Sequence, residues 1–142
     1  MSATALRLLF VDELADDQVM YGTGLQLLGF DVCMVASVPE ALTHADTFRP
    51  HVIVLHLGTG QWDLCSAFSE RPPTADVPIV VITAHVRPDR ANRDRARATP
   101  NCAAFIGKPC THEDIALVVR RVAAGERHIE FPSGPSTYGV YR

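Results

Sequence analysis

The chain has 142 residues, 47% of them hydrophobic and 20% charged, with a formal net charge of −3. This length and composition fit one globular domain with its own core. The negative charge disfavours DNA binding, because a protein that binds nucleic acid neutralises phosphates with an excess of Lys and Arg. The apolar runs are too short to span a membrane, and the first residues lack the long apolar stretch of a signal peptide. We therefore expect a cytoplasmic protein.

Short apolar runs alternate with segments of helical length along the chain. The runs lie at residues 6–11, 32–35, 52–55, 79–82 and 103–106. Apolar runs without polar alternation are typical of strands buried on both faces of a parallel sheet. The pattern therefore predicts an α/β fold with five parallel strands joined by crossover helices.

The segments between the runs carry helix signals of different strength. Helices are predicted at residues 16–28, after Ser37, and at 62–69, 88–98 and 115–124. Two helix starts have the spacing of a capping box, Ser37 with Glu40 and, more weakly, Thr111 with Asp114. After Gly125 the chain becomes rich in Pro, Gly and aromatic residues. We expect the tail 126–142 either to be disordered or to dock through its aromatic side chains.

Polar residues follow several predicted strands where each strand ends. Asp12 and Glu13 follow the first strand, His56 the third, Thr83 the fourth and Lys108 the fifth. The carboxyl ends of parallel strands meet at one edge of a sheet, which is where α/β proteins bind ligands. These side chains are therefore expected to share one site.

This arrangement resembles the receiver domain of two-component response regulators over roughly residues 5–125. That family has an acidic pair, a phosphoacceptor Asp, a Ser or Thr, and a Lys-Pro at these places, and Phe105 matches its switch aromatic. The resemblance implies a flavodoxin-like, doubly wound sheet of five strands in the order 2-1-3-4-5, with helices on both faces. It divides the chain into a receiver-like domain, 1–125, and the tail.

The family's chemistry does not carry over intact, because His56 stands at the phosphoacceptor position. In the family, carboxylates hold Mg²⁺, the Asp accepts the phosphoryl group, and the hydroxyl and Lys bind it. Imidazole removes that nucleophile and one oxygen ligand. Two carboxylates remain, with Lys108 as their counter-ion, so we expect no cofactor and weak Mg²⁺ binding at most. We also expect no enzyme, because the acidic turn after the first strand would repel a nucleotide or flavin phosphate.

Several roles are open for His56. The residue is a structural member of a degenerate site, hydrogen-bonded to Asp12, Glu13 or a backbone group, or it titrates with a pKa raised by the flanking acids. Weaker alternatives are a transition-metal site formed with Glu13 and His85, and phosphorylation of the imidazole itself.

Without an output domain, the expected function is regulation of a protein partner by contact. The resemblance places the partner surface on the fourth helix, the fifth strand and the fifth helix, with Phe105 in that surface. The fourth helix carries several arginines, so an acidic partner or a homodimer through Arg–Asp pairs is expected.

Overall fold

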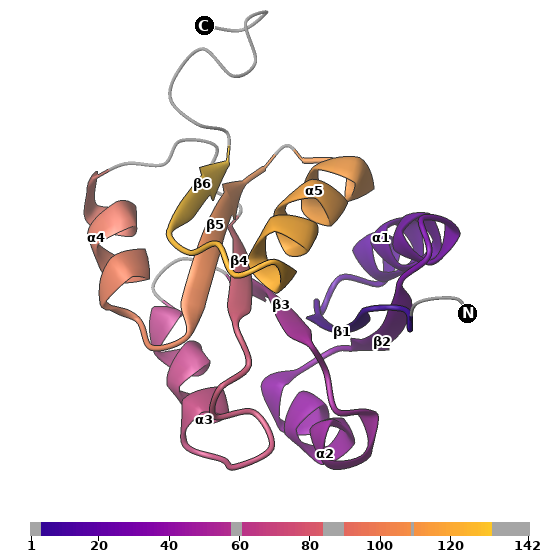
Figure 1. The fold of residues 1–142 in the computed structure, drawn as a ribbon, viewed down its shortest axis with the longest axis horizontal. Coiled ribbons are helices and arrows are strands. Elements are labelled where there is room, and N and C mark those ends of the chain that lie inside the picture. The colour runs from indigo at the N-terminus through magenta and orange to yellow at the C-terminus, as the bar shows by residue number, and fades with distance from the viewer. Residues whose placement is uncertain (1–3, 58–60, 84–89, 109, 132–142) are drawn as a thin grey trace, which may run out of the picture.

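A parallel sheet forms the middle layer of the computed structural model, which describes residues 4–57, 61–83, 90–108 and 110–131 (Figure 1). Within these residues the sheet has six strands in the order β2-β1-β3-β4-β5-β6, and every neighbouring pair is parallel. The strands are β1 (Arg7–Val11), β2 (Asp31–Val35), β3 (Val52–Leu57), β4 (Ile79–Thr83), β5 (Cys102–Gly107) and β6 (Ile129–Phe131).

Helices cover both faces of this sheet, as predicted. On one face lie α1 (Ala15–Leu27) and α5 (His112–Ala123), and on the other lie α2 (Val38–Phe48), the 3₁₀ turn η1 (Trp62–Cys65), α3 (Ser66–Ser69) and α4 (Arg90–Ala98). Alternate residues of each strand serve the two layers: Leu8 and Phe10 pack beneath α1 and α5, while Leu9 packs on the other face. The predicted α/β class is confirmed.

Side chains cap two of the helices at the positions that the sequence indicates. The Oγ of Ser37 accepts the Glu40 backbone N–H at 3.3 Å at the start of α2. At the start of α5 the box is reciprocal, since Thr111 Oγ1 accepts from the Asp114 amide and Asp114 Oδ2 accepts from the Thr111 amide. Because this box starts α5 at His112, the helix begins one turn earlier than the predicted apolar stripe.

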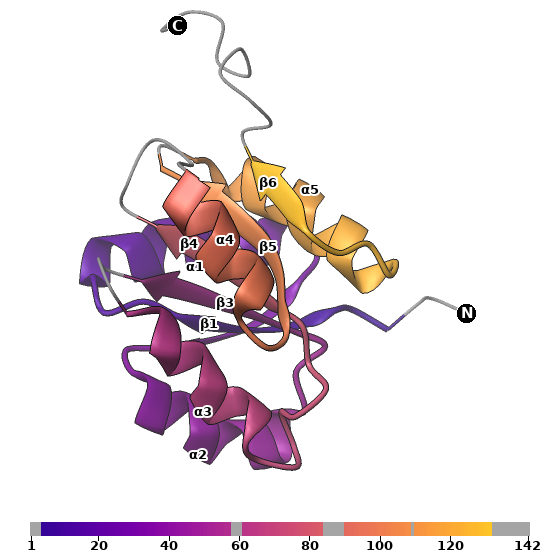
Figure 2. The same ribbon diagram turned by 90° about the vertical axis from the view of Figure 1, so that its left-hand side faces the viewer.

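The sixth strand corrects the prediction of five. β6 lies beside β5, with Ile129 opposite Ala104 and Phe131 opposite Ile106 (Figure 2). Ile129 is buried in the core, and Phe131 packs against it. The first part of the tail therefore belongs to the sheet, because a parallel strand here completes the hydrogen bonds of β5 and buries two apolar side chains. Residues 132–142 lie outside the described residues.

The helices of the described ranges are all too short or too polar to cross a lipid bilayer.

Candidate functional site

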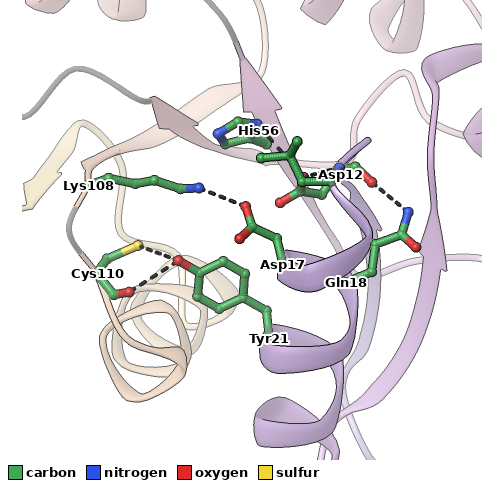
Figure 3. A network of polar contacts seen from close by, with 8 residues as sticks. Asp12, Asp17, Gln18, Tyr21, His56, Lys108 and Cys110 are labelled. Carbon is green, nitrogen blue, oxygen red and sulfur yellow. Dashed lines mark hydrogen bonds and ion pairs between the residues drawn. The ribbon is translucent and has the colours of Figure 1, made fainter.

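Three of the predicted site residues, Asp12, His56 and Lys108, come together at the carboxyl edge of the sheet (Figure 3). Asp12 directly follows β1, His56 lies on β3, Thr83 ends β4 and Lys108 directly follows β5. Strand register sets their spacing, because His56 pairs with Ile82 on β4, and Thr83 pairs with the last residue of β5.

Asp12 is the most buried acid of this edge, at 1% exposure. Its Oδ1 accepts the Leu14 amide at 3.0 Å, its backbone carbonyl accepts from the Gln18 side chain, and its Oδ2 is buried without a hydrogen-bond partner. Burial, and then the nearby charge of Asp17, raise the pKa of the Asp12 carboxyl to about 6, although the Leu14 hydrogen bond opposes the rise. Asp12 is thus an acid that takes up a proton under mildly acidic conditions.

Lys108 binds a carboxylate that sequence reasoning did not single out. Its Nζ donates to Asp17 Oδ2 at 2.7 Å, and the two side chains are only 22% and 16% exposed (Figure 3). Burial opposes ionisation of Asp17, but the bond and charge of Lys108 outweigh it and lower the pKa of this carboxyl. The Lys108 counter-ion thus belongs to Asp17 of α1. Asp17 lies four residues before Tyr21, so the two side chains share one face of α1. This spacing is the sequence signal that could have located Asp17.

The Tyr21 side chain lies beside this ion pair. Its hydroxyl lies 3.2 Å from the Cys110 carbonyl and donates to it, and its ring centroid is 5.8 Å from Lys108 Nζ. The side chain is 3% exposed, and burial raises its pKa, so the hydroxyl stays protonated and remains a donor. The contact ties α1 to the segment that leads into α5.

His56 has few polar contacts for a largely buried imidazole, which is 12% exposed. Its Nδ1 lies 3.9 Å from Asp12 Oδ1, too far for a hydrogen bond, and its Nε2 is buried without a partner. Burial and the charge of Lys108 lower the pKa of His56, although Asp17 and Glu13 oppose this. The prediction of a raised pKa is wrong, because it counted the neighbouring acids and not the cost of burying an imidazolium.

The remaining residues of the expected constellation differ in placement. Thr83 is buried, and its carbonyl accepts the Lys108 amide at 3.1 Å. Glu13 is exposed, and His85, proposed with it for a metal, lies outside the described residues. Within the described ranges, no group of three His, Cys, Asp or Glu side chains is placed to hold a metal ion.

Phe105 lies inside the protein and not on its surface. It is 2% exposed, packs with the core beneath α2, α3 and α4, and contacts Trp62 with ring centroids 5.7 Å apart. The expectation that Phe105 sits in the partner surface is not met in this structure, because its side chain is buried between the sheet and the helices α2, α3 and α4.

Comparison with known proteins identifies the fold. No family model matches the chain, and no curated protein does. Among solved structures, the chemotaxis response regulator CheY4 of Vibrio cholerae is 21% identical and superposes with a TM-score of 0.73, covering 84% of this chain and 99% of that one. A response regulator from Desulfuromonas acetoxidans gives 21% and 0.70, covering 84% and 97%. The receiver domain of a sensor histidine kinase from Pseudomonas aeruginosa PAO1 gives 18% and 0.72, covering 86% and 100%. The chain therefore has the fold of CheY-like receiver domains.

Proposed function

We propose that the chain is a receiver-like module of two-component signal transduction that acts by contact with a protein partner, without aspartyl phosphorylation. The observation that carries the proposal is His56, which lies on β3 where the resemblance places the phosphoacceptor aspartate. An imidazole has no carboxylate oxygen, so it cannot form the acyl phosphate on which an aspartyl switch depends.

The surroundings of His56 also disfavour phosphorylation of the ring itself. A nucleophilic nitrogen has to reach the phosphorus of a donor in line. Nε2 is buried, and Nδ1 faces Asp12 Oδ1 at 3.9 Å. A phosphoryl donor approaching Nδ1 would also meet the Asp12 carboxyl, which repels it whenever it is ionised.

The cation of the site is already neutralised within the chain. Lys108 bonds to Asp17 at 2.7 Å in a largely buried pair. To bind a phosphoryl group, Lys108 would have to leave Asp17 and strand a partly buried carboxylate, which is costly. The ion pair therefore supports a site that keeps a single conformation and binds no phosphoryl group.

The residues of the edge do not fit Mg²⁺. This ion prefers several oxygen ligands in octahedral geometry. Asp12 offers one buried oxygen without a donor, whereas Glu13 is exposed and His56 presents nitrogen, which suits transition metals better. By contrast, the P. aeruginosa receiver domain was solved with magnesium coordinated in its active-site cleft.

We propose that the partner surface centres on α4 and on β6, the strand at this edge of the sheet. Arg95 and Arg97 of α4 are exposed, and Ala96 between them packs into the core. β6 covers the edge of β5, so a partner at this side meets β6 together with α4 (Figure 2). The arginines favour a partner with an acidic surface.

A magnesium titration followed by Trp62 fluorescence tests the proposal. Trp62 is the only tryptophan, and it is buried in η1, against Phe105. We expect no saturable change in the native chain and a saturable one in His56→Asp, which restores the missing oxygen ligand. The control is His51→Asp, the same replacement just before the opposite end of β3, which should behave like the native chain. Saturation of the native chain at the magnesium concentration that saturates His56→Asp would contradict the proposal.

A pH-responsive site is a second candidate, favoured by the buried Asp12 carboxyl. Its pKa of about 6 lies within the range of mild acidification. If the site responds to pH, the Trp62 emission should show a transition near pH 6 that is absent in Asp12→Asn. The same transition in that variant would exclude Asp12 as its source.

A further inference from the structure

The large hydrophobic side chains that remain exposed in the described residues gather on and beside α1. Val19 is 69% and Leu27 is 82% exposed, and the others are Leu14, Met20, Leu28 and Leu117 of α5. Clustered apolar exposure of this kind marks an interaction site rather than the scattered exposure of an ordinary surface.

Helix α1 carries apolar residues on two opposite faces. Its inner face contributes Tyr21 and Leu25 to the core beneath the sheet. Met20 and Leu27 are seven residues apart, or two helical turns, so they lie on one line on the opposite side, flanked by Val19. Exposed apolar side chains that share one face of a surface helix form a patch that a partner can cover. We call Val19, Met20, Leu27 and the exposed Thr23 between them the outer face of α1.

Helix α5 extends this face on one side. The two helices approach closely where Gly24 meets the His112 ring, because a Cβ at Gly24 would overlap that ring. About two helical turns after His112 on α5, Arg120 donates to the Leu28 carbonyl at 3.2 Å. Leu117 lies between these two contacts and is half exposed, so it borders the outer face of α1.

The charges at the two ends of the outer face have opposite sign. The exposed Asp16 lies in the first turn of α1, and the exposed Glu13 lies just before the helix. The exposed Arg120 lies beside the end of α1. At 1.5 Å per residue, the distance from Asp16 to Leu27 along the helix is about 16 Å. An identical helix laid antiparallel across this one would place its acidic end against the arginine of the first, and its arginine against the acids.

We propose that two copies of this chain associate through the outer face of α1, with the two α1 helices antiparallel about a two-fold axis. Such a contact uses the same patch twice, joining apolar residues at its centre and opposite charges at both ends. Thr23 is a small side chain at the middle, which lets the helices approach. The association involves a different surface from the basic helix α4 and does not depend on the state of His56.

Sedimentation velocity of the full chain over a concentration series tests the contact. We expect a monomer–dimer equilibrium that Leu27→Glu weakens by about tenfold or more, since it buries a charge in an apolar contact. The matched control is Arg97→Glu on α4, which also introduces a glutamate on an exposed helix and should leave the equilibrium unchanged. A chain that stays monomeric at all concentrations, or a dimer lost in Arg97→Glu and retained in Leu27→Glu, overturns the proposal.

A charge exchange tests the antiparallel arrangement. Asp16→Arg and Arg120→Glu should each weaken the dimer, and the double variant should recover most of the native affinity, because the exchanged charges attract again. Circular dichroism verifies that each variant is folded. A folded double variant that associates no better than the single variants contradicts the antiparallel pairing.

Discussion

Replacing Asp12 with Asn should stabilise the protein at neutral pH. The side chain is buried, and only one of its carboxyl oxygens has a hydrogen-bond donor. Asn keeps an oxygen for the Leu14 amide. It also adds an N–H₂ group on the side chain that interacts with the Asp17 carboxylate, which we expect to accept from it. The replacement therefore removes a buried charge while the local hydrogen bonding is kept or improved.

The expected gain depends on pH in a defined direction. The pKa of Asp12 is raised from 3.8 to about 6 on folding, so its contribution is fully favourable below pH 3.8 and is lost as the pH rises through about 6. At 1.36 kcal/mol per pKa unit, the cost of ionised Asp12 at pH 8 is about 3 kcal/mol as an upper limit. Asp12→Asn removes this cost at pH 8 and should gain little near pH 4.

Urea unfolding of both proteins between pH 5 and 8 measures the effect. A gain of about 3 kcal/mol corresponds to a rise in the urea midpoint of roughly 1–2 M. His56, whose pKa is lowered on folding, makes the native state less stable as the pH falls below 6.5, but it does so in both proteins. The difference between the two curves therefore reports Asp12 together with the change that its lost charge causes in His56, 3.9 Å away. Equal destabilisation of Asp12→Asn at pH 5 and pH 8 would refute the reasoning.

Three further predictions concern packing and are checked by the same urea measurement at pH 7. Gly24→Ala should destabilise the protein by about 1–2 kcal/mol, because the new methyl group overlaps the His112 ring. Gly22→Ala on the same helix should stabilise it by up to about 1 kcal/mol, because the new methyl group meets only the Met34 side-chain methyl group at 3.4 Å. The changes in unfolding free energy of these two variants are required to have opposite signs. Thr111→Ala should cost about 1 kcal/mol by removing the α5 cap, and no loss would mean that the cap is replaced by water. Ile129→Ala should cost about 2–4 kcal/mol if β6 belongs to the core, and a loss below about 0.5 kcal/mol would contradict its docking.

The sheet and its edge are predictable from sequence because their signals are local. An uninterrupted apolar run such as residues 52–55 indicates a strand buried on both faces, and the next residues of that strand then belong to the carboxyl edge. Ser37 and Thr111 mark helix starts for a similarly local reason, since a cap needs only its own turn.

The parts that were missed depend on distant contacts. β6 has only three residues in a segment rich in Pro and Gly, and it becomes a strand only because β5 offers an open edge. Asp17 becomes the partner of Lys108, 91 residues away, only through the packing of α1 beside the end of β5. The pKa of His56 follows burial more than the neighbouring acids, and burial is a property of the folded chain.

Intact mass measurement after incubation with acetyl phosphate and Mg²⁺ tests the central claim most directly. The native chain is expected to show no added phosphoryl group, and His56→Asp is expected to show one that is labile in base, as an acyl phosphate is. If the restored aspartate gains no phosphoryl group, the edge formed by Asp12, Thr83 and Lys108 is not a degenerate receiver site. A phosphoryl group on the native chain that is lost in His56→Ala would contradict the claim that this module works without phosphorylation.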